Sequence, residues 1–315
     1  MRLLAFLIAG SAVWLALSGS AVADNGPHVQ GAGVVTDSCA GCHRVHTAQA
    51  ENLLVQSESA LCFTCHGSSG TGAATDVVDG LGYSSAARTG TPGALRGGGF
   101  SFALINSANP SGQQSSGSNT SGTVPVLATG AATTSTHSYS GADVRAWGNG
   151  AIASGAGPTI QLRCASCHDP HGNGNYRILR GIPLQSNATP AVSIADAGTK
   201  VYTTTNYWSV SDSNGPSFIA NVSAWCSTCH TRYLAGAGSG DTPSGDPIFA
   251  YRHRSNETSQ GTTTCAQCHV AHGSNASMSG SYSSNVPFPD GSAGGSDSRL
   301  LRINNRGTCQ MCHNR

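Results

Sequence analysis

The sequence is short of charge and of apolar side chains. Charged residues make up 10% of its 315 residues, against about 25% in a typical soluble domain. Lys200 is the only lysine, and basic and acidic side chains nearly balance. These features exclude a charge-expanded disordered chain, and nothing in them indicates nucleic-acid binding. The apolar content is too low for a large side-chain core, so we expect something else to fill the interior.

Long apolar runs are missing after the first residues, so we expect no membrane span in the mature chain. Residues 1–23 have the features of a secretory signal: Arg2, an apolar stretch from Leu3 to Leu17, and the small residues Ala21-Val22-Ala23. A membrane anchor is the less favoured alternative, because the apolar stretch is short for a span. We expect an exported single domain over residues 24–315.

No cysteine is left over for a disulfide bridge, because all 12 fall in six C-x-x-C-H motifs. One such motif could arise by chance or belong to a zinc site. Six in an exported chain indicate c-type haem attachment, in which both cysteines bond to the macrocycle and the histidine ligates the iron. We therefore expect six covalently bound haem c groups. In order from haem 1 to haem 6, the motifs are Cys39, Cys42 and His43; Cys62, Cys65 and His66; Cys164, Cys167 and His168; Cys226, Cys229 and His230; Cys265, Cys268 and His269; and Cys309, Cys312 and His313.

Methionine, the competing sixth ligand of haem iron, is nearly absent. After the signal only Met278 and Met311 remain, and Met311 lies inside a C-x-x-C-H loop. Histidine numbers 12, of which six belong to the motifs, so one further histidine remains for each iron. We therefore predict low-spin, low-potential haems with two histidine ligands each. The six further ligand candidates are His28, His46, His137, His171, His253 and His272.

The ligands repeat in three units, at about 28–66, 137–230 and 253–313. Each unit has an upstream histidine, a doubled motif C-x-x-C-H-x-x-H and a plain C-x-x-C-H. The upstream histidine can serve the haem of the plain motif. The last histidine of the doubled motif is too close in sequence to pass around its own haem, so it must serve another odd-numbered one.

If that histidine serves the preceding unit, His171 ligates haem 1 and His272 ligates haem 3. His46 then has no preceding unit in the chain, and haem 5, on Cys265 and Cys268, has no following one. A head-to-tail neighbour fills both vacancies with one bond, and such a contact propagates a filament unless a rotation closes it into a ring. We therefore predict that His46 is donated in trans to haem 5 of a neighbouring subunit.

Between the motifs we expect the fold of a multihaem cytochrome c, mostly irregular chain with short helices around six haems and little sheet. Residues 67–136 are rich in glycine and small polar residues, so we expect a flexible loop or one draped over haem. Short helices are predicted at 49–57 and 217–230, and a strand or hairpin at 200–211.

Six haems would add twelve propionates, which arginine can bind in a bidentate manner. The candidates beside haem ligands are Arg44, Arg163, Arg177, Arg180, Arg252 and Arg254, with ordinary solvated surface charge as the alternative. Large aromatic side chains are expected to pack against haem edges, and an electron-relay role is the less favoured interpretation. These are Trp147, Trp208, Trp225 and Tyr233.

The order of doubled and plain motifs, with a histidine soon after the signal and the last motif nearly terminal, resembles the OmcS-type extracellular cytochromes. Three runs carry the resemblance: Cys-His-Arg-Val-His, Cys-His-Asp-Pro-His-Gly and Cys-His-Val-Ala-His-Gly. It covers the haem-binding skeleton and little of the chain between. It implies a secreted protein, periplasmic in transit, that polymerises at or outside the cell surface into a filament with a continuous haem chain. Its partners would be copies of itself, redox proteins and extracellular acceptors.

Two other functions share these residues. A monomeric periplasmic or outer-surface shuttle, or a subunit of an electron conduit, would differ only in its assembly. A multihaem oxidoreductase would need an iron with an open coordination site. No iron here lacks a candidate sixth ligand, so we predict that the protein is not an enzyme.

Overall fold

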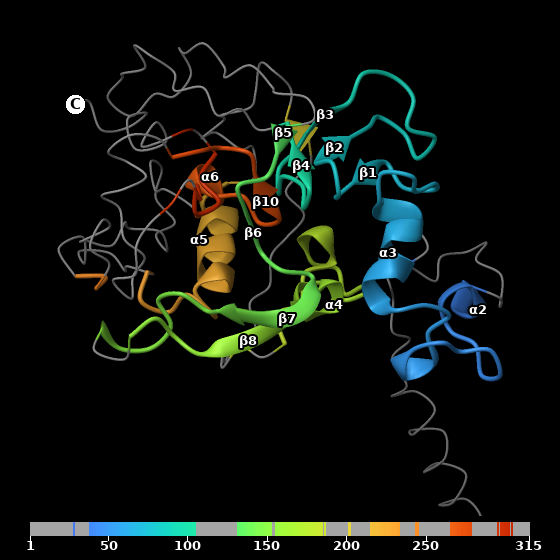
Figure 1. Ribbon diagram of the computed structural model, residues 1–315, viewed down its shortest axis with the longest axis horizontal. Coiled ribbons are helices and arrows are strands. Elements are labelled where there is room, and N and C mark those ends of the chain that lie inside the picture. Colours follow the sequence, from blue (N-terminus) through green and yellow to red (C-terminus); the bar gives the residue numbers. More distant parts are fainter. Residues whose placement is uncertain are drawn as a thin grey trace, which may run out of the picture.

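The fold is seen in a computed structural model in which part of the chain is described (Figure 1). The described residues are 28, 38–104, 131–152, 155–184, 186, 201–202, 215–233, 243–245, 265–278, 295, 297–302 and 304. No helix among them is long and apolar enough to cross a membrane. Several residues named above lie outside this part: Cys309, Cys312 and His313 of the haem 6 motif, the upstream His253, residues 1–23, Arg252, Arg254 and Trp208.

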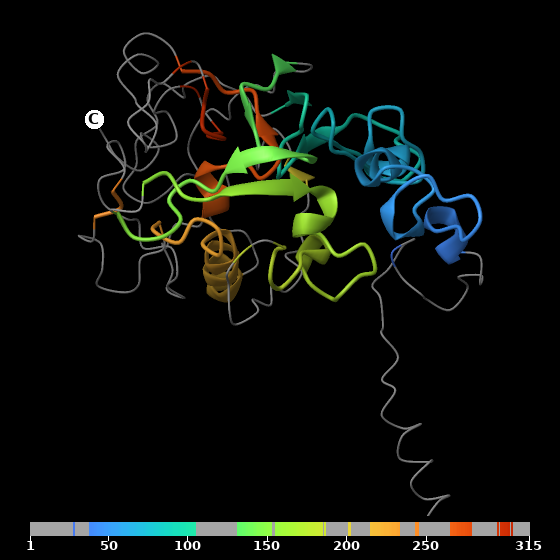
Figure 2. The same cartoon turned by 60° about the horizontal axis from the view of Figure 1, so that its bottom comes forward.

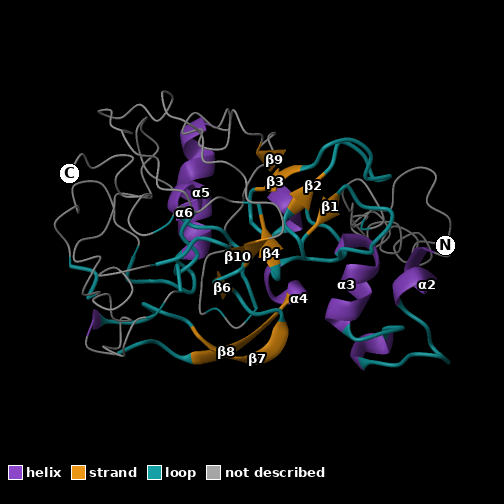
Figure 3. Cartoon of the chain, turned by 45° about the horizontal axis from the view of Figure 1, so that its top comes forward, coloured by secondary structure: helices purple, strands orange, loops and turns teal. Residues whose placement is uncertain are grey.

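Five short α-helices contain or lead into the first five C-x-x-C-H motifs. Because residues i and i+3 share a helix face, one turn brings both thiols to the same side. Figures 1 and 3 show α2 and α3 at one end, α5 and α6 toward the other, and α4 between them. The motifs therefore follow one another along the long axis. The helices are α2 (Ser38–Cys42), α3 (Glu58–His66), α4 (Cys164–Cys167), α5 (Gly215–Cys226) and α6 (Cys265–Cys268).

The strands are short and antiparallel, and they lie between these helices (Figure 3). The largest sheet has the order β1-β2-β3-β9. A hairpin of β7 and β8 runs along one side of the molecule (Figures 1 and 3) and leads directly into α4 (Figure 2), and its register shifts between Ser140 and Asp143. The strands are β1 (Thr75–Asp76), β2 (Leu81–Gly82), β3 (Gly93–Leu95), β4 (Phe102–Ala103), β5 (Ala131–Ala132), β6 (Ser135–Thr136), β7 (Ser140–Arg145), β8 (Thr159–Arg163), β9 (Val201–Tyr202) and β10 (Gly273–Ser274).

Few helices, much irregular chain and small sheets confirm the expected fold class. The helix predicted at 49–57 is wrong: a 3-10 turn at Glu51–Leu53 contains left-handed residues, which interrupt a helix, and α3 begins only at Glu58. The helix predicted at 217–230 exists as α5 but ends at Cys226, where a turn closes the motif. Of the strand predicted at 200–211, the described residues contain β9 alone.

Residues 67–136 are not a plain loop where they are described. They contain strands β1 to β6. Several of these strands pair with one another in antiparallel fashion, as Thr75 does with Gly82. The β7–β8 hairpin was not expected either, because Gly141 and Asp143 interrupt its alternation of apolar and polar residues. Short glycine-rich strands carry too weak a periodicity to be found from sequence.

The buried apolar side chains are few and mostly small. Among the described residues they include Ala94, Leu95 and Ala103, and the buried polar residues are as numerous, with Asp76 and Arg302 nearly inaccessible. The one defined apolar cluster centres on Tyr176 and Val222 among these residues. Side chains alone therefore supply little of the burial that folding requires.

We expect the chain to stay unfolded when haem attachment is prevented, because bound haem must supply the missing interior and its ligand bonds. The measurement is far-ultraviolet circular dichroism with limited proteolysis of the chain made without haem-attachment machinery. The same chain carrying haem is the control and should resist the protease. A haem-free chain that melts cooperatively and resists proteolysis equally would contradict this expectation.

Candidate haem sites

A backbone hydrogen bond closes the C-x-x-C-H loop of each described doubled motif. The amide of His43 donates to Cys39 O at 2.7 Å, that of His168 to Cys164 O at 3.0 Å, and that of His269 similarly. This bond places the histidine ring beside the two thiols. None of the ten described cysteines forms a disulfide, so both thiols of each motif are available for thioether bonds.

Among the described residues, histidine rings from distant parts of the sequence lie close together in four pairs. The ring centroids lie 6.1 to 6.2 Å apart in all four. Each pair joins the histidine of a C-x-x-C-H motif to one of the further histidines. The pairs are His66 with His28, His43 with His171, His230 with His137, and His168 with His272.

This separation fits an iron between each pair of rings. A bond from imidazole nitrogen to a first-row metal is about 2 Å long, and each ring adds roughly 1 Å between nitrogen and centroid. Two imidazoles on opposite sides of one metal therefore need centroids roughly 6 Å apart, and direct stacking would bring them closer. The pairs are the ones that the repeat predicts, whereas iron ligation itself stays a prediction.

The sixth haem site stays a prediction from sequence throughout. Its attachment residues Cys309 and Cys312 and its motif histidine His313 lie outside the described residues, as does His253, the upstream histidine that would face it. The described part of the chain therefore brings together histidine pairs for haems 1 to 4, and it adds the motif of haem 5.

Hydrogen bonds fix how the motif histidines present their rings. The Nδ1–H groups of His43, His168, His230 and His269 donate to the backbone carbonyls of Asn52, Arg177, Trp147 and Arg299, at 2.6 to 3.0 Å. In His66 the partner is the hydroxyl of Thr75, at 2.8 Å. With the proton held on Nδ1, Nε2 keeps its lone pair for a metal.

Burial favours the neutral form, which is the form that binds iron, in five of the paired histidines. Desolvation is the main cause that lowers the pKa of His66 and of His230 to about 4, and that of His272 to about 3. It also lowers the pKa of His137 and of His168. At neutral pH, protons therefore do not compete for the nitrogen that faces the partner ring.

Each doubled motif is followed by the same tight turn, which we call the return turn: Asn52-Leu53, Arg177-Ile178 and Arg299-Leu300. All three pairs have φ between 51° and 61° in both residues. Left-handed backbone costs about 1–2 kcal/mol per residue without glycine, and only one other non-glycine residue among those described, Arg88, has it. Strain of this kind persists where the surroundings determine it.

The return turn makes three equivalent contacts with its motif. The carbonyl of the first turn residue accepts from the Nδ1–H of the motif histidine. The carbonyl of the second turn residue accepts from the amide of the residue after that histidine, as Ile178 O does from Asp169 N at 2.7 Å. Two residues further on, an amide donates to the second cysteine, as Arg180 N does to Cys167 O at 2.8 Å. The turn therefore clamps the loop that positions both thiols and the ring.

The return turn was not predicted from sequence, although a signal exists. Asn52-Leu53-Leu54, Arg177-Ile178-Leu179 and Arg299-Leu300-Leu301 share a polar residue and two aliphatic ones. The spacing from the motif hides this similarity, because the third turn begins 30 residues after its histidine and the first two only nine.

The doubled motifs also support the upstream histidines of the preceding unit. His28 Nδ1–H donates to Pro170 O at 2.8 Å, and His137 Nδ1–H donates to Ala271 O at 2.7 Å. Each acceptor is the residue before the last histidine of a doubled motif. One doubled motif therefore contacts two histidine pairs of the unit before it.

The thiols of consecutive motifs are neighbours. Cys62 and Cys164 are within hydrogen-bonding reach, which raises the pKa of Cys62 and lowers that of Cys164, and Cys226 and Cys265 form an equivalent pair. Burial raises the pKa of Cys42 with Cys65 as the next cause, and that of Cys167 to about 12 with Cys229 as the next cause. Thiol contacts thus join motif 2 to 3 and motif 4 to 5, and an electrostatic interaction between thiols joins motif 1 to 2 and motif 3 to 4.

Arginine side chains donate hydrogen bonds to the backbone of the C-x-x-C-H loops. Arg180 Nε donates to Ala165 O at 2.6 Å, inside a motif, and the unpredicted Arg302 does the same to Ala266 O at 2.9 Å. Arg44 Nε donates to Ala40 O at 3.3 Å. Propionate binding by the six candidate arginines stays a prediction.

The aromatic candidates have protein partners. Trp225 donates to Arg180 O at 2.6 Å and packs on the Tyr176 cluster, and Trp147 O accepts the His230 bond. The Tyr233 ring lies against Gly148, where a side chain would clash with it. Contacts of these rings with haem edges stay a prediction.

The surface near the first doubled motif is exposed. His46 is exposed, and Val45 and Leu53 beside it are 74% and 50% accessible. Within the described part of the chain, no ring stacks on His46. The motif histidine of haem 5, His269, is exposed as well.

Comparison with known proteins gives one finding. A family model described as "Doubled CXXCH motif" matches residues 32–71, which contain the first two motifs. No curated protein and no solved structure matches the chain. The match indicates a multihaem c-type cytochrome with covalently bound haem and a role in electron transport.

Replacing His171 with alanine should turn one iron high-spin, because the facing histidine of haem 1 loses its partner. Electron paramagnetic resonance and carbon monoxide binding to the reduced protein should each report one altered site. In a Cys39→Ala/Cys42→Ala background, which lacks haem 1, His171→Ala should add no further high-spin iron, whereas His28→Ala should still add one. A second high-spin site from His171→Ala in that background would refute the pairing.

Proposed function

We propose that the protein carries electrons outside the cell along six bis-histidine c-type haems, as the subunit of a head-to-tail filament. The observation that carries the proposal is the set of four histidine ring pairs at 6.1 to 6.2 Å. The C-x-x-C-H cysteines would hold each haem, and the paired histidines would hold its iron. When bound, haem supplies one-electron chemistry through the ferric and ferrous states of its iron.

The residues favour transfer of electrons over catalysis. Both faces of each iron would be taken by imidazole, so no position remains for a substrate. The Nδ1–H bonds to Asn52, Arg177, Trp147 and Arg299 hold these rings in place. That the protein is not an enzyme is part of the proposal.

The neighbouring thiols support a continuous path. Cys62 lies beside Cys164 and Cys226 beside Cys265, and the thiols of Cys42 and Cys65 and of Cys167 and Cys229 are close enough to interact electrostatically. Helix α3 packs on α4, and α5 packs on α6. Haems attached at such neighbouring sites would lie close enough for electrons to pass in order of the motifs.

The contacts between units support polymerisation. Unit two gives unit one a histidine, His171, and a carbonyl, that of Pro170. Unit three gives unit two the equivalents, His272 and Ala271. Unit one has the same two groups in His46 and Val45, and both residues are exposed.

A further copy of the chain could receive these groups at its third unit, where His269, the motif histidine of haem 5, is exposed. The same contact would then continue from copy to copy and propagate a filament. Its subunits would be secreted, periplasmic in transit, and would exchange electrons with redox proteins and with acceptors at or beyond the cell surface.

We expect six covalent haems in the mature protein, all low-spin. Intact mass after denaturation should exceed that of the polypeptide by six haems, and spectra at neutral pH should show no substantial high-spin population. Fewer haems would disprove the count. Rapid binding of carbon monoxide by the reduced wild-type protein would reveal an open iron and reinstate an enzymatic function.

Replacing His46 with alanine should abolish polymerisation and leave a six-haem monomer with one altered iron. Electron microscopy and the spin state together give the result. Thr47→Ala, a change at the neighbouring exposed residue, is the matched control and should still form filaments. Normal filaments of His46→Ala with six low-spin haems would refute donation in trans, and a monomeric wild-type protein would indicate a shuttle or conduit subunit instead.

A further inference from the structure

The histidine of the second motif differs from the others in its hydrogen bond. His66 Nδ1 is hydrogen-bonded to a hydroxyl, Thr75 Oγ1, at 2.8 Å, and with iron on Nε2 the Nδ1–H would be the donor. The other four described motif histidines all donate to backbone carbonyls. Thr75 lies on β1 in the segment between the first two units, nine residues after His66.

The acceptor of this bond affects the iron that the ring would hold. A strong acceptor draws the Nδ1 proton away and makes the imidazole more basic toward the metal. A more basic ligand favours ferric over ferrous iron, so it lowers the reduction potential. A hydroxyl oxygen is a weaker acceptor than an amide carbonyl, so His66 would be the less basic ligand.

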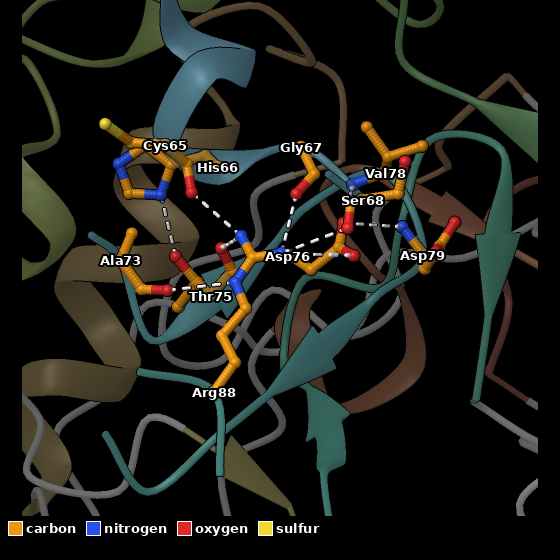
Figure 4. Close-up of polar contacts among 10 residues, drawn as sticks. All are labelled: Cys65, His66, Gly67, Ser68, Ala73, Thr75, Asp76, Val78, Asp79 and Arg88. Carbon is orange, nitrogen blue, oxygen red and sulfur yellow. Dashed lines mark hydrogen bonds and ion pairs between the residues drawn. The ribbon is translucent and has the colours of Figure 1, made fainter. Parts of the chain in front are cut away.

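A positive charge lies beside the same loop. The Arg88 guanidinium donates to the carbonyls of Cys65 at 2.8 Å, Gly67 at 2.8 Å, Ser68 at 3.3 Å, Ala73 at 3.1 Å and Thr75 at 3.0 Å. Figure 4 shows the guanidinium among these groups. Its side chain is 13% accessible, so solvent screens its charge little.

Asp76 offsets this charge in part. Its carboxylate is 3.8 Å from the guanidinium, but its Oδ1 accepts from the amides of Val78 and Asp79, which spreads the negative charge on the side away from His66 (Figure 4). The guanidinium lies beside the motif of His66, because Arg88 Nη2 donates to Cys65 O at 2.8 Å. Asp76 is 3.8 Å from the guanidinium and, among the described residues, has no hydrogen bond of its own to that loop.

The ligand orientation of haem 2 can be compared with that of haem 1. The ring planes of its pair, His43 and His171, meet at 18°, and those of His66 and His28 meet at 15°. The orientation of the ligand planes thus differs little between haems 1 and 2. The two sites differ in the Nδ1 acceptor, in the buried guanidinium and in burial, because Cys39 and Cys42 are exposed and Cys62 and Cys65 are partly buried.

We propose that Thr75 and Arg88 are positioning residues that set the reduction potential of haem 2 above that of haem 1: the Arg88 charge raises it, and the Thr75 hydroxyl lowers it less than the Asn52 carbonyl lowers that of haem 1. The inference depends on the haem occupancy proposed above. When one electron passes between these two neighbours, one haem is oxidised as the other is reduced, and the electron resides mostly on haem 2. The segment 67–104 then has a redox role in addition to its structural one.

The test is redox potentiometry of the intact six-haem protein, followed by the paramagnetically shifted haem methyl signals in nuclear magnetic resonance. Thr75→Val removes the acceptor and should raise one of the six potentials. Arg88→Gln removes the charge and should lower the potential of the same haem. Thr75→Ser and Arg88→Lys keep the acceptor and the charge, so both should stay near wild type.

Two sets of controls accompany these variants. Thr89→Val and Arg145→Gln make the same changes at exposed positions and should shift no potential. His28→Met replaces the facing ligand of haem 2 and should raise the potential of that haem, which identifies the signal that Thr75→Val and Arg88→Gln must move. Mass spectrometry of every variant counts its haems first, so a missing haem counts against the proposed function and not against this inference.

With six haems retained, three results would overturn the inference: no shift, shifts of the same sign for Thr75→Val and Arg88→Gln, or an Arg88→Lys variant as low as Arg88→Gln. The last would mean that Arg88 acts only by holding the loop. If Arg88→Gln loses its haem, Thr75→Val against Thr75→Ser decides alone, and equal potentials in that pair would overturn the inference.

Discussion

The facing of histidine rings from different units is the interaction on which the structure depends. His43 and His171 are far apart in sequence, as are His168 and His272, yet each pair meets at the separation that one metal requires. Ordering so much irregular chain carries a large entropic cost. The buried apolar side chains of the described residues are too few to offset it, so ligand bonds and haem burial must do so. In this account the same haem ligation would stabilise the fold and provide the sites for electron transfer.

The same constraint explains features that would otherwise be unfavourable. The return turns keep non-glycine residues such as Leu53 and Ile178 in left-handed backbone, because their carbonyls are needed by the motif histidine and by the residue after it. Arg88 gives most of its donors to carbonyls of a single loop. Such loops have little secondary structure to satisfy their backbone, so side chains and tight turns do it instead.

The sequence was sufficient where chemistry depends on residue type and count. The C-x-x-C-H motifs, the equal number of further histidines and the order of units predicted which rings the structure brings together, for example His28 with His66. It was insufficient where position depends on backbone shape. The helix expected over 49–57 fails because Asn52 and Leu53 turn left-handed, and Thr75 and Arg88 were missed because no pattern marks them in the glycine-rich segment that follows His66. Short strands such as β1 and β2 leave no periodic pattern to detect.

The central claim is that pairs of histidines, some within one unit and some from successive units, hold one ordered row of haems. A high-resolution electron cryomicroscopy map of the haem-loaded protein tests it most directly. The account predicts iron density between His28 and His66, His43 and His171, His137 and His230, and His168 and His272, with haems 1 to 5 adjacent in the order of their motifs. A haem whose facing histidine is missing, or comes from another of these pairs, would contradict it, as would a row interrupted between consecutive motifs.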